Sequence, residues 1–282
     1  MPTSPLSAAQ AARQALADRL QHMRKDAGLT GRELSARCGW HPAKTSRLQK
    51  AEVAPSDSDI RAWCTACGAE NQIPELIAAS RSVSSMYMEW KRLQRAGLRQ
   101  LQETYTQAYR KSRILRFYSS DVVPGMLQTH RYAAAILSRF ANDANSVDDL
   151  EQAVAQRMQS TRPMYEGNHR IACLVEESVL RYRIAEASAM AGQLGHLLSV
   201  MALPRVSLGI IPFTARRALW PVETFHVLDD RLVEVELVTA RVRITALSEV
   251  REYIQTFAEL QGLAVYGQEA RAAVTAAIDA LG

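Results

Sequence analysis

The sequence has few cysteines, few aromatic residues and no long apolar run. Four cysteines in 282 residues are too few for a disulfide framework. The longest uncharged stretch, residues 187–204, contains Gln193, Gly195 and His196 and is too polar for a membrane span. The first residues, MPTSPLSAAQAARQ, lack the apolar core of a signal peptide. These absences favour a globular protein of the cytoplasm with no membrane partner.

Motifs of the common enzyme classes are also missing. The sequence contains no G-x-S-x-G, P-loop, G-x-G-x-x-G or HExxH pattern. Glu176 and Glu177 resemble an acid–base pair, but neighbouring residues on a strand point to opposite faces of a sheet. We therefore expect no catalytic site and no cofactor.

One cysteine pair offers an alternative. Cys64 and Cys67 form a WCxxC pattern, but a thioredoxin-like redox motif needs a preceding strand, whereas both cysteines lie on a predicted helix. Buried cysteines of this kind are usually inert. Cys38 and His41 would complete a zinc site, yet there is no second CxxC and the spacing is irregular. A thiol redox protein acting through Cys64 and Cys67 is the distant alternative, and we expect no metal.

Charge is divided unevenly along the chain. Residues 1–117 carry 19 Lys and Arg against 10 Asp and Glu, which gives +9, and residues 118–282 carry 15 against 19, which gives −4. A basic front half suggests a polyanionic partner. The basic residues of 71–117 either extend a contact with the DNA backbone or form the solvated face of a connecting helix, and we favour the helical connector.

The front of the chain carries the signals of short helices. Apolar spacing predicts a first helix over residues 7–26, which Gly28 ends. Thr30, with Glu33 three residues later, forms a capping box that starts a helix over 30–38. Gly39 gives a tight turn before a third helix over 42–50, which begins with Pro42, and a fourth follows over 56–67. A helix, a tight turn and a second helix is helix-turn-helix geometry, whose second helix reads the major groove.

The segment LTGRELSARCGWHPAKTSRLQKAEVAPSDSDIRAW resembles the helix-turn-helix of the Xre and phage-repressor class. The resemblance implies DNA binding by the outward residues Thr30, Arg32, His41, Ala43, Lys44, Ser46, Arg47 and Lys50. That class usually has polar residues where this chain has Gly31, Pro42 and Ala43, which leaves Lys44, Ser46 and Arg47 as the main candidate readers of bases. Arg47 is suited to a bidentate pair with guanine, and Ala43 to a thymine methyl group. Ala51 stands where the class usually has glycine, so some strain is expected there.

From residue 118 the pattern changes to an α+β domain. Alternating apolar residues predict strands near 171–175 and 206–210, and a hairpin turning at Asp229-Asp230 with Glu234 and Glu236 on its solvent face. Helices are predicted over 131–140, 148–160, 186–202, 247–257 and 268–280. The fold class expected is α+β overall, with an all-α helix-turn-helix bundle at 8–70, the connector at 71–117 and an α+β domain at 118–282.

The segments VVPGMLQTHRYAAAIL, AGQLGHLL, VSLGIIPF and ETFHVLDDRLVEVE resemble the C-terminal domain of WhiJ-like actinobacterial regulators. The resemblance implies a transcription regulator of development or secondary metabolism, with a small protein partner encoded nearby. Four residues are weak candidates for a ligand or partner pocket, and the alternative is that the VPGMLQT segment only fixes a turn and a helix start, with Thr129 as the cap. The four are Gln128, Thr129, Tyr132 and Trp220.

The sequence therefore predicts a DNA-binding regulator associated with the nucleoid. One recognition helix reads few base pairs, so we expect a homodimer on an inverted repeat of double-stranded DNA. Residues 71–282 are expected to hold the dimer, through the helix at 247–257 and the hairpin around 233–237. The alternative is an antitoxin-like interaction protein whose DNA binding serves autoregulation.

Overall fold

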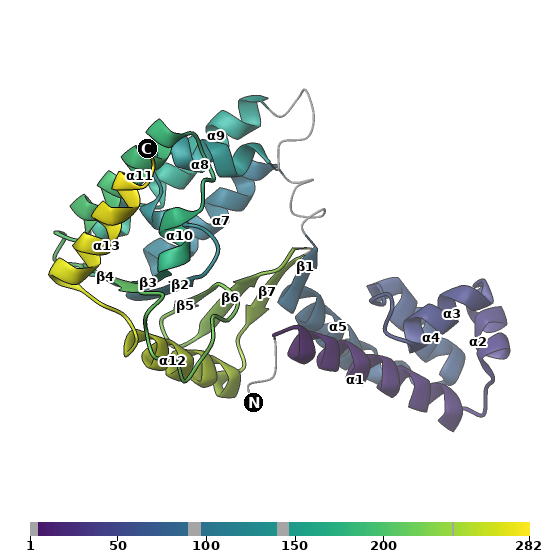
Figure 1. Ribbon diagram of the computed structural model, residues 1–282. Helices are drawn as coiled ribbons and strands as arrows, with labels where there is room; N and C mark the ends of the chain where they lie inside the picture. Colours follow the sequence, from purple (N-terminus) through teal and green to yellow (C-terminus); the bar gives the residue numbers. More distant parts are fainter. Residues whose placement is uncertain (1–4, 90–96, 140–146, 239) are drawn as a thin grey trace. The chain divides into compact units, whose positions relative to one another are not determined.

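The computed structural model describes residues 5–89, 97–139, 147–238 and 240–282 (Figure 1). The chain forms two compact units. The first comprises Met1–Met88 with Ala240–Arg243, and the second comprises Glu89–Thr239 with Ile244–Gly282. Within the described residues, no helix has the length and apolar character that crossing a membrane requires.

The first unit is a bundle of helices. Its helices are α1 (Pro5–Asp26), α2 (Gly31–Cys38), α3 (Pro42–Gln49), α4 (Asp57–Cys67), the short 3-10 helix η1 (Glu70–Gln72) and α5 (Ile73–Met86). The expected capping signals are confirmed, because Thr30 and Ser56 form capping boxes and Gly39 and Gly68 end α2 and α4 with φ near +67°. The order helix, tight turn, helix over α2 and α3 agrees with the sequence prediction.

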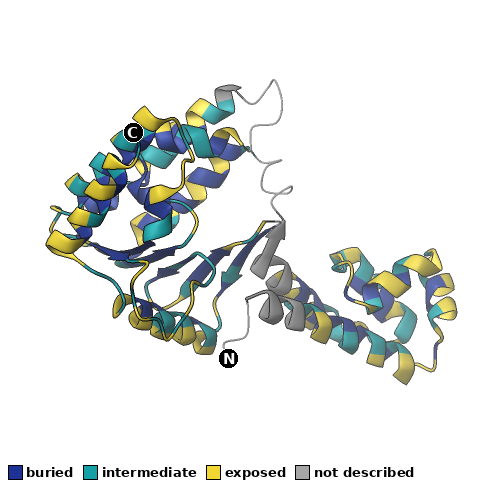
Figure 2. Ribbon diagram, viewed as in Figure 1, coloured by how far each residue is buried: buried dark blue, intermediate teal, exposed yellow. Residues whose placement is uncertain are grey.

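The core of this bundle includes a helix that the sequence assigns to a connector. Leu34, Ile60 and Trp63 are buried together with Leu76 and Ile77 of α5. Helix α5 packs against both α1 and α4. The bundle therefore continues past residue 70, and Figure 2 shows its buried residues facing inward along α1 to α5.

The second unit is a mixed sheet covered by helices. Its strands β2 (Ile114–Ser119), β3 (Arg170–Glu176), β4 (Val206–Ile211), β5 (Phe225–Leu228) and β6 (Leu232–Glu236) lie in the order β6-β5-β2-β3-β4. Strands β2, β3 and β4 are parallel, whereas β5 runs antiparallel to both β2 and β6. Two further strands, β1 (Tyr87–Glu89) and β7 (Ala240–Ile244), most of whose residues belong to the first unit, pair with each other.

Helices cover both faces of this sheet. Helix α12 (Leu247–Gln261) contacts β5 and β6, with Phe225 against Phe257. The next residue of β5, His226, points to the other face, where it meets Phe117 and Tyr109. That face carries most of the remaining helices (Figure 1). The helices and short 3-10 turns are α7 (Leu98–Lys111), η2 (Gly125–Leu127), α8 (His130–Ser138), α9 (Val147–Gln159), η4 (Arg162–Met164), α10 (Glu177–Arg181), α11 (Ala187–Val200) and α13 (Gly267–Asp279).

Three sequence expectations for this part are wrong. Residues 114–117 are not helical, because they begin β2, which lies between β3 and β5 in the sheet. Glu234 does not face solvent, because it is 1% exposed, whereas Glu236 is exposed as expected. The hairpin and the 247–257 helix are not spare apolar surfaces, since Val233, Val235, Val250 and Phe257 are buried within the chain. Leu247 is the one large apolar residue of the helix that is exposed. The α+β class is confirmed.

Candidate nucleic-acid interface

Local hydrogen bonds fix both ends of the turn between α2 and α3. The Thr30 hydroxyl accepts a hydrogen bond from the Glu33 N–H, and Glu33 accepts one from the Thr30 N–H at 2.7 Å. At the other end, His41 caps α3, because its Nδ1 accepts from the N–H of Ala43 at 3.3 Å. Pro42 follows at the first helical position, where its missing N–H costs nothing. Two of the candidate DNA residues, Thr30 and His41, therefore also start the two helices.

A buried pair of hydroxyl groups joins the two helices. Ser35 of α2 lies 2.7 Å from Thr45 of α3, oxygen to oxygen. The Ser35 hydroxyl donates to the carbonyl of Gly31 at 2.7 Å and accepts the proton of Thr45. Both residues are 2% exposed. Leu34 and Leu48 pack beside them in the core. This polar link between otherwise apolar surfaces fixes how α3 is presented, and no sequence signal marked it.

The outward side of this motif carries exposed polar and basic residues. Ser46 and Arg47 of α3 are exposed, and Ala43 is exposed one turn earlier. Within the described part of the chain, no group accepts a hydrogen bond from the Arg47 guanidinium. Arg32 on α2 and Lys50 at the end of α3 are exposed as well. The cationic side chains of Arg32, Arg47 and Lys50 and the hydroxyl of Ser46 are therefore exposed near the small residue Ala43, as the sequence predicts.

Lys44 differs from that expectation. Its Nζ lies 2.6 Å from Oδ1 of Asp59 on α4, and 4.4 Å from the centre of the Trp40 ring. Trp40 in turn packs against Trp63, with ring centres 6.2 Å apart. The ammonium group is therefore engaged within the bundle, where it joins α3 to α4. Asp59 is the residue that sequence reasoning missed, because its position suggests only a helix cap.

The carboxylate of Asp59 serves two neighbours at once. Its Oδ1 accepts from Lys44, and its Oδ2 accepts from the Ser56 N–H at 3.1 Å to close the capping box of α4. Burial alone would raise the pKa of Asp59, but the hydrogen bonds from Lys44 and Ser56 outweigh it and lower the pKa. The ionised carboxylate is thus part of the folded bundle.

The end of α3 carries the strain expected at Ala51. Ala51 has φ +55°, one of two non-glycine residues with positive φ in the described chain. A side chain in this conformation costs about 1–2 kcal/mol, which glycine would avoid. Its methyl group is buried, which offsets part of that cost.

The cysteines of α4 lie in the bundle. Cys64 is fully buried, and Cys67 and Cys38 are partly buried around it. Burial, with a smaller effect of Cys67, raises the pKa of the Cys64 thiol to about 11. Burial also raises the pKa of Cys67 and of Cys38. No three His, Cys, Asp or Glu side chains in the described part of the chain are placed to hold a metal ion.

The four candidate pocket residues of the second unit do not lie together. Gln128 is buried and lines a cavity described below. Tyr132 is buried beneath the same loop, where its hydroxyl accepts from the N–H of Val123 at 3.3 Å. Thr129 precedes α8 but makes no capping bond with its side chain, and its N–H donates to Gln193. Trp220 is 62% exposed and does not line that cavity.

Comparisons with known proteins support this picture of two parts. Residues 15–76 match the family described as a helix-turn-helix domain, and residues 102–276 match the family described as a domain of unknown function, DUF5753. One similar solved structure is described as TrmBL2, an archaeal chromatin protein with a novel mode of DNA binding. It shares 12% identity over 85% of this chain and 88% of that chain, with a TM-score of 0.29, which shows neither a common fold nor a common function. No curated protein matches the sequence significantly.

Proposed function

Because the chain belongs to the family of proteins with the DUF5753 domain and carries a helix-turn-helix domain before it, we propose that it is a sequence-specific transcription regulator of the Xre type. We propose further, from the WhiJ-like resemblance of its C-terminal segments, that it acts in a developmental or secondary-metabolism pathway of an actinobacterium. It acts in the cytoplasm at the nucleoid, and we propose no catalytic activity and no cofactor for it.

The observation that supports this proposal best is the exposed Arg47 on α3. A guanidinium with no partner among the described residues is available to pair with a guanine edge or a phosphate. Ser46 lies beside it, while Arg32 and Lys50 are exposed on neighbouring positions for phosphate contact. Lys44 has a minor part in this proposal, because its charge is already paired with Asp59.

Assembly belongs to the same proposal. A single recognition helix contacts only a few base pairs, so high specificity normally needs two half-sites about one helical turn apart. We propose that two copies of the chain bind an inverted repeat through their first units, and that the second unit holds the dimer or binds a small protein partner. Leu247, 58% exposed at the start of α12, is an available apolar contact for that purpose.

The first test is selection of binding sites from a random duplex library by the full chain, followed by titration of the selected duplex over a salt series. The proposal predicts an enriched inverted repeat. It also predicts that log K falls by about 0.9 per phosphate neutralised for each unit of log salt concentration. No enrichment, or an affinity that does not change with salt, contradicts the proposal.

A further inference from the structure

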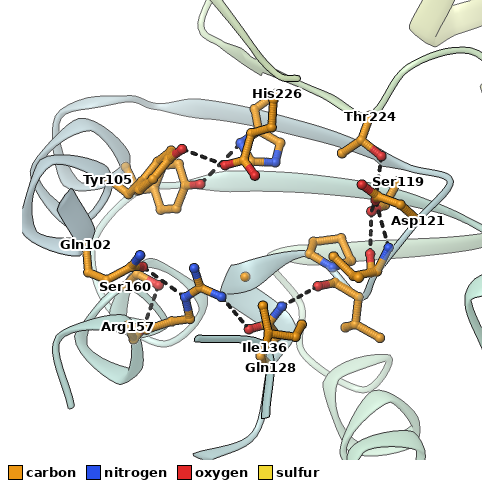
Figure 3. A pocket seen from close by; sticks show the side chains of 16 residues that line it. Gln102, Tyr105, Ser119, Asp121, Gln128, Ile136, Arg157, Ser160, Thr224 and His226 are labelled. Atoms are coloured by element: carbon orange, nitrogen blue, oxygen red, sulfur yellow. Dashed lines mark hydrogen bonds between the residues drawn. The ribbon is translucent and has the colours of Figure 1, made fainter. Parts of the chain in front are cut away.

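The second unit contains a polar cavity that DNA binding does not use. Its volume is about 220 Å³, and it lies between α7, α9, strand β5 and the loop that leads from β2 into η2 (Figure 3). Interior voids in proteins are usually few and not much larger than a water molecule. This one has room for about seven waters at liquid density, yet it is smaller than the roughly 300–1,000 Å³ pockets of drug-sized ligands.

Arg157 of α9 supplies the positive charge at one side of the cavity. Its Nε donates to Oε1 of Gln102 at 2.9 Å, and its Nη1 donates to Oε1 of Gln128 at 2.8 Å. Both partners are neutral amides, and no carboxylate of the described residues forms an ion pair with Arg157. Burial lowers the pKa of this guanidinium, and the negative charge of Glu236, which lines the same cavity, offsets only part of that effect.

The VPGMLQT segment builds the wall next to Arg157. The Nε2 of Gln128 donates to the carbonyl of Val123 at 2.7 Å, so the same amide that accepts from Arg157 also fixes the loop. Gly125 brings the backbone against the guanidinium, because a Cβ there would lie 3.9 Å from Cζ of Arg157. The arginine is thus held in one orientation before any ligand arrives, which lowers the entropy cost of binding.

The opposite side of the cavity is acidic. Oδ1 of Asp121 accepts hydrogen bonds from Oγ1 of Thr224 at 2.6 Å and from the Val122 N–H at 2.7 Å. No described residue donates to its other oxygen. Figure 3 shows Asp121 and Thr224 at one end of the view and Arg157 with Gln102 at the other. The rings of Tyr105, Tyr109 and His226 also line the cavity, together with the carboxylate of Glu236, which accepts a hydrogen bond from the Tyr105 hydroxyl at 2.5 Å.

We infer that this cavity binds a small, flat organic acid whose carboxylate pairs with Arg157 and whose far end donates a hydrogen bond to Asp121. The guanidinium fork matches a carboxylate. The aromatic side chains offer a flat face to the body of such a molecule. This site goes beyond the proposed function, and it does not depend on DNA binding.

The test uses 4-aminobenzoate as the probe, with two molecules of the same shape as controls. Binding to the full chain is measured by ligand-observed NMR titration without DNA, so the result is independent of the DNA-binding proposal. 4-Aminobenzamide keeps the amine but lacks the charge, and benzoate keeps the charge but lacks the amine. We expect saturable binding of 4-aminobenzoate, with at least about tenfold weaker binding of the amide, the loss expected when a charge-assisted hydrogen bond is removed.

Protein variants locate the site. Arg157→Gln is expected to weaken binding of 4-aminobenzoate at least about tenfold, whereas Arg110→Gln, an exposed arginine of α7, leaves it unchanged. Ile136→Phe fills the cavity from α8 without removing a polar group and is also expected to abolish binding. If the Arg157→Gln protein does not fold, the Ile136→Phe variant alone tests whether the acid binds in this cavity.

Three outcomes overturn the inference. The first is no saturable binding of the acid up to about 10 mM. The second is equal binding of acid and amide. The third is unchanged binding by folded Arg157→Gln or Ile136→Phe protein. The first would mean that the cavity does not bind such an acid, the second that Arg157 does not recognise its charge, and the third that the acid binds elsewhere on the protein.

Discussion

Nζ of Lys44 lies 2.6 Å from Oδ1 of Asp59, so a lysine of the recognition helix is bound to the next helix of the bundle. The side chain of Asp59 is 14% exposed and that of Lys44 40% exposed, which places the pair at the edge of the core. We expect a lysine held there to support the orientation of α3 more than it contacts bases. The different roles expected for Lys44 in stability and for Arg47 in base recognition can be measured.

Asp59→Asn keeps the size of the side chain and its capping oxygen but removes the charge that pairs with Lys44. We expect the free energy of unfolding to fall by about 0.5–1 kcal/mol at pH 7, as for other partly exposed ion pairs. Urea unfolding followed by tryptophan fluorescence measures the change, because Trp40 and Trp63 lie in this bundle. Glu52→Gln is the matched control, since Glu52 is exposed. A loss as small as that of the control would show that the pair contributes nothing.

The stability difference between wild type and Asp59→Asn should also depend on pH. The pKa of Asp59 is lowered in the folded state, despite its burial, by hydrogen bonds from Lys44 and Ser56. Its contribution is therefore complete above the unfolded pKa of about 3.9 and disappears as pH falls through the lower folded value. The difference in unfolding free energy between wild type and Asp59→Asn is expected to shrink toward zero by about pH 2. A difference that grows as pH falls would contradict the sign of this shift.

Thr45→Val tests the buried link between α2 and α3. Valine keeps the shape of threonine but leaves the Ser35 hydroxyl with only the carbonyl of Gly31. We expect a loss of about 1 kcal/mol in unfolding free energy, the usual value for one buried hydrogen bond. Ser46→Ala, which removes an exposed hydroxyl on the same helix, is the control for stability. Equal stability of Thr45→Val and wild type would mean that this hydrogen bond contributes nothing to stability and that apolar packing alone holds α2 against α3.

The ends of the helices can be predicted from nearby residues in the sequence, whereas contacts between residues far apart in the chain cannot. Thr30, Gly39 and Ser56 act within four residues of themselves, so the limits of α2, α3 and α4 follow from residue type. Lys44 and Asp59 are 15 residues apart, and nothing in either position predicts the pair. Likewise the sequence predicts helix over the first residues of β2, because the strand is defined by its pairing with β3 and β5, which come more than 50 residues later.

The cysteines of α4 are expected to react slowly with alkylating reagents. With a pKa of about 11, about one Cys64 thiol in a thousand is ionised at pH 8, and the thiolate is the reactive form. Burial restricts access further. Iodoacetamide labelling followed by peptide mass spectrometry should modify Cys64 and Cys67 at least about tenfold more slowly in native protein than in urea. Rapid labelling of both in native protein would revive the thiol redox alternative.

The oligomeric state of the full chain can be measured directly. Multi-angle light scattering of the full chain should give the mass of a dimer. Leu247→Glu should shift it toward the monomer because it places a charge at an exposed apolar contact of α12. Val53→Glu, which alters an exposed apolar residue of the first unit, should not. A monomeric wild-type chain refutes the proposed dimer, and a dimer that Leu247→Glu leaves intact refutes Leu247 as its contact.

The most direct test of the central claim is the affinity of Arg47→Ala, Lys44→Met and Lys50→Ala for the selected operator and for single-base variants of it. Arg47→Ala is expected to lose about 1–3 kcal/mol of binding free energy and to stop discriminating at one base pair. Lys50→Ala is expected to weaken all duplexes alike, as loss of a phosphate contact does. Lys44→Met should keep the base preference of wild type, because its ammonium group is bound to Asp59. Loss of discrimination in Lys44→Met with none in Arg47→Ala would contradict the account.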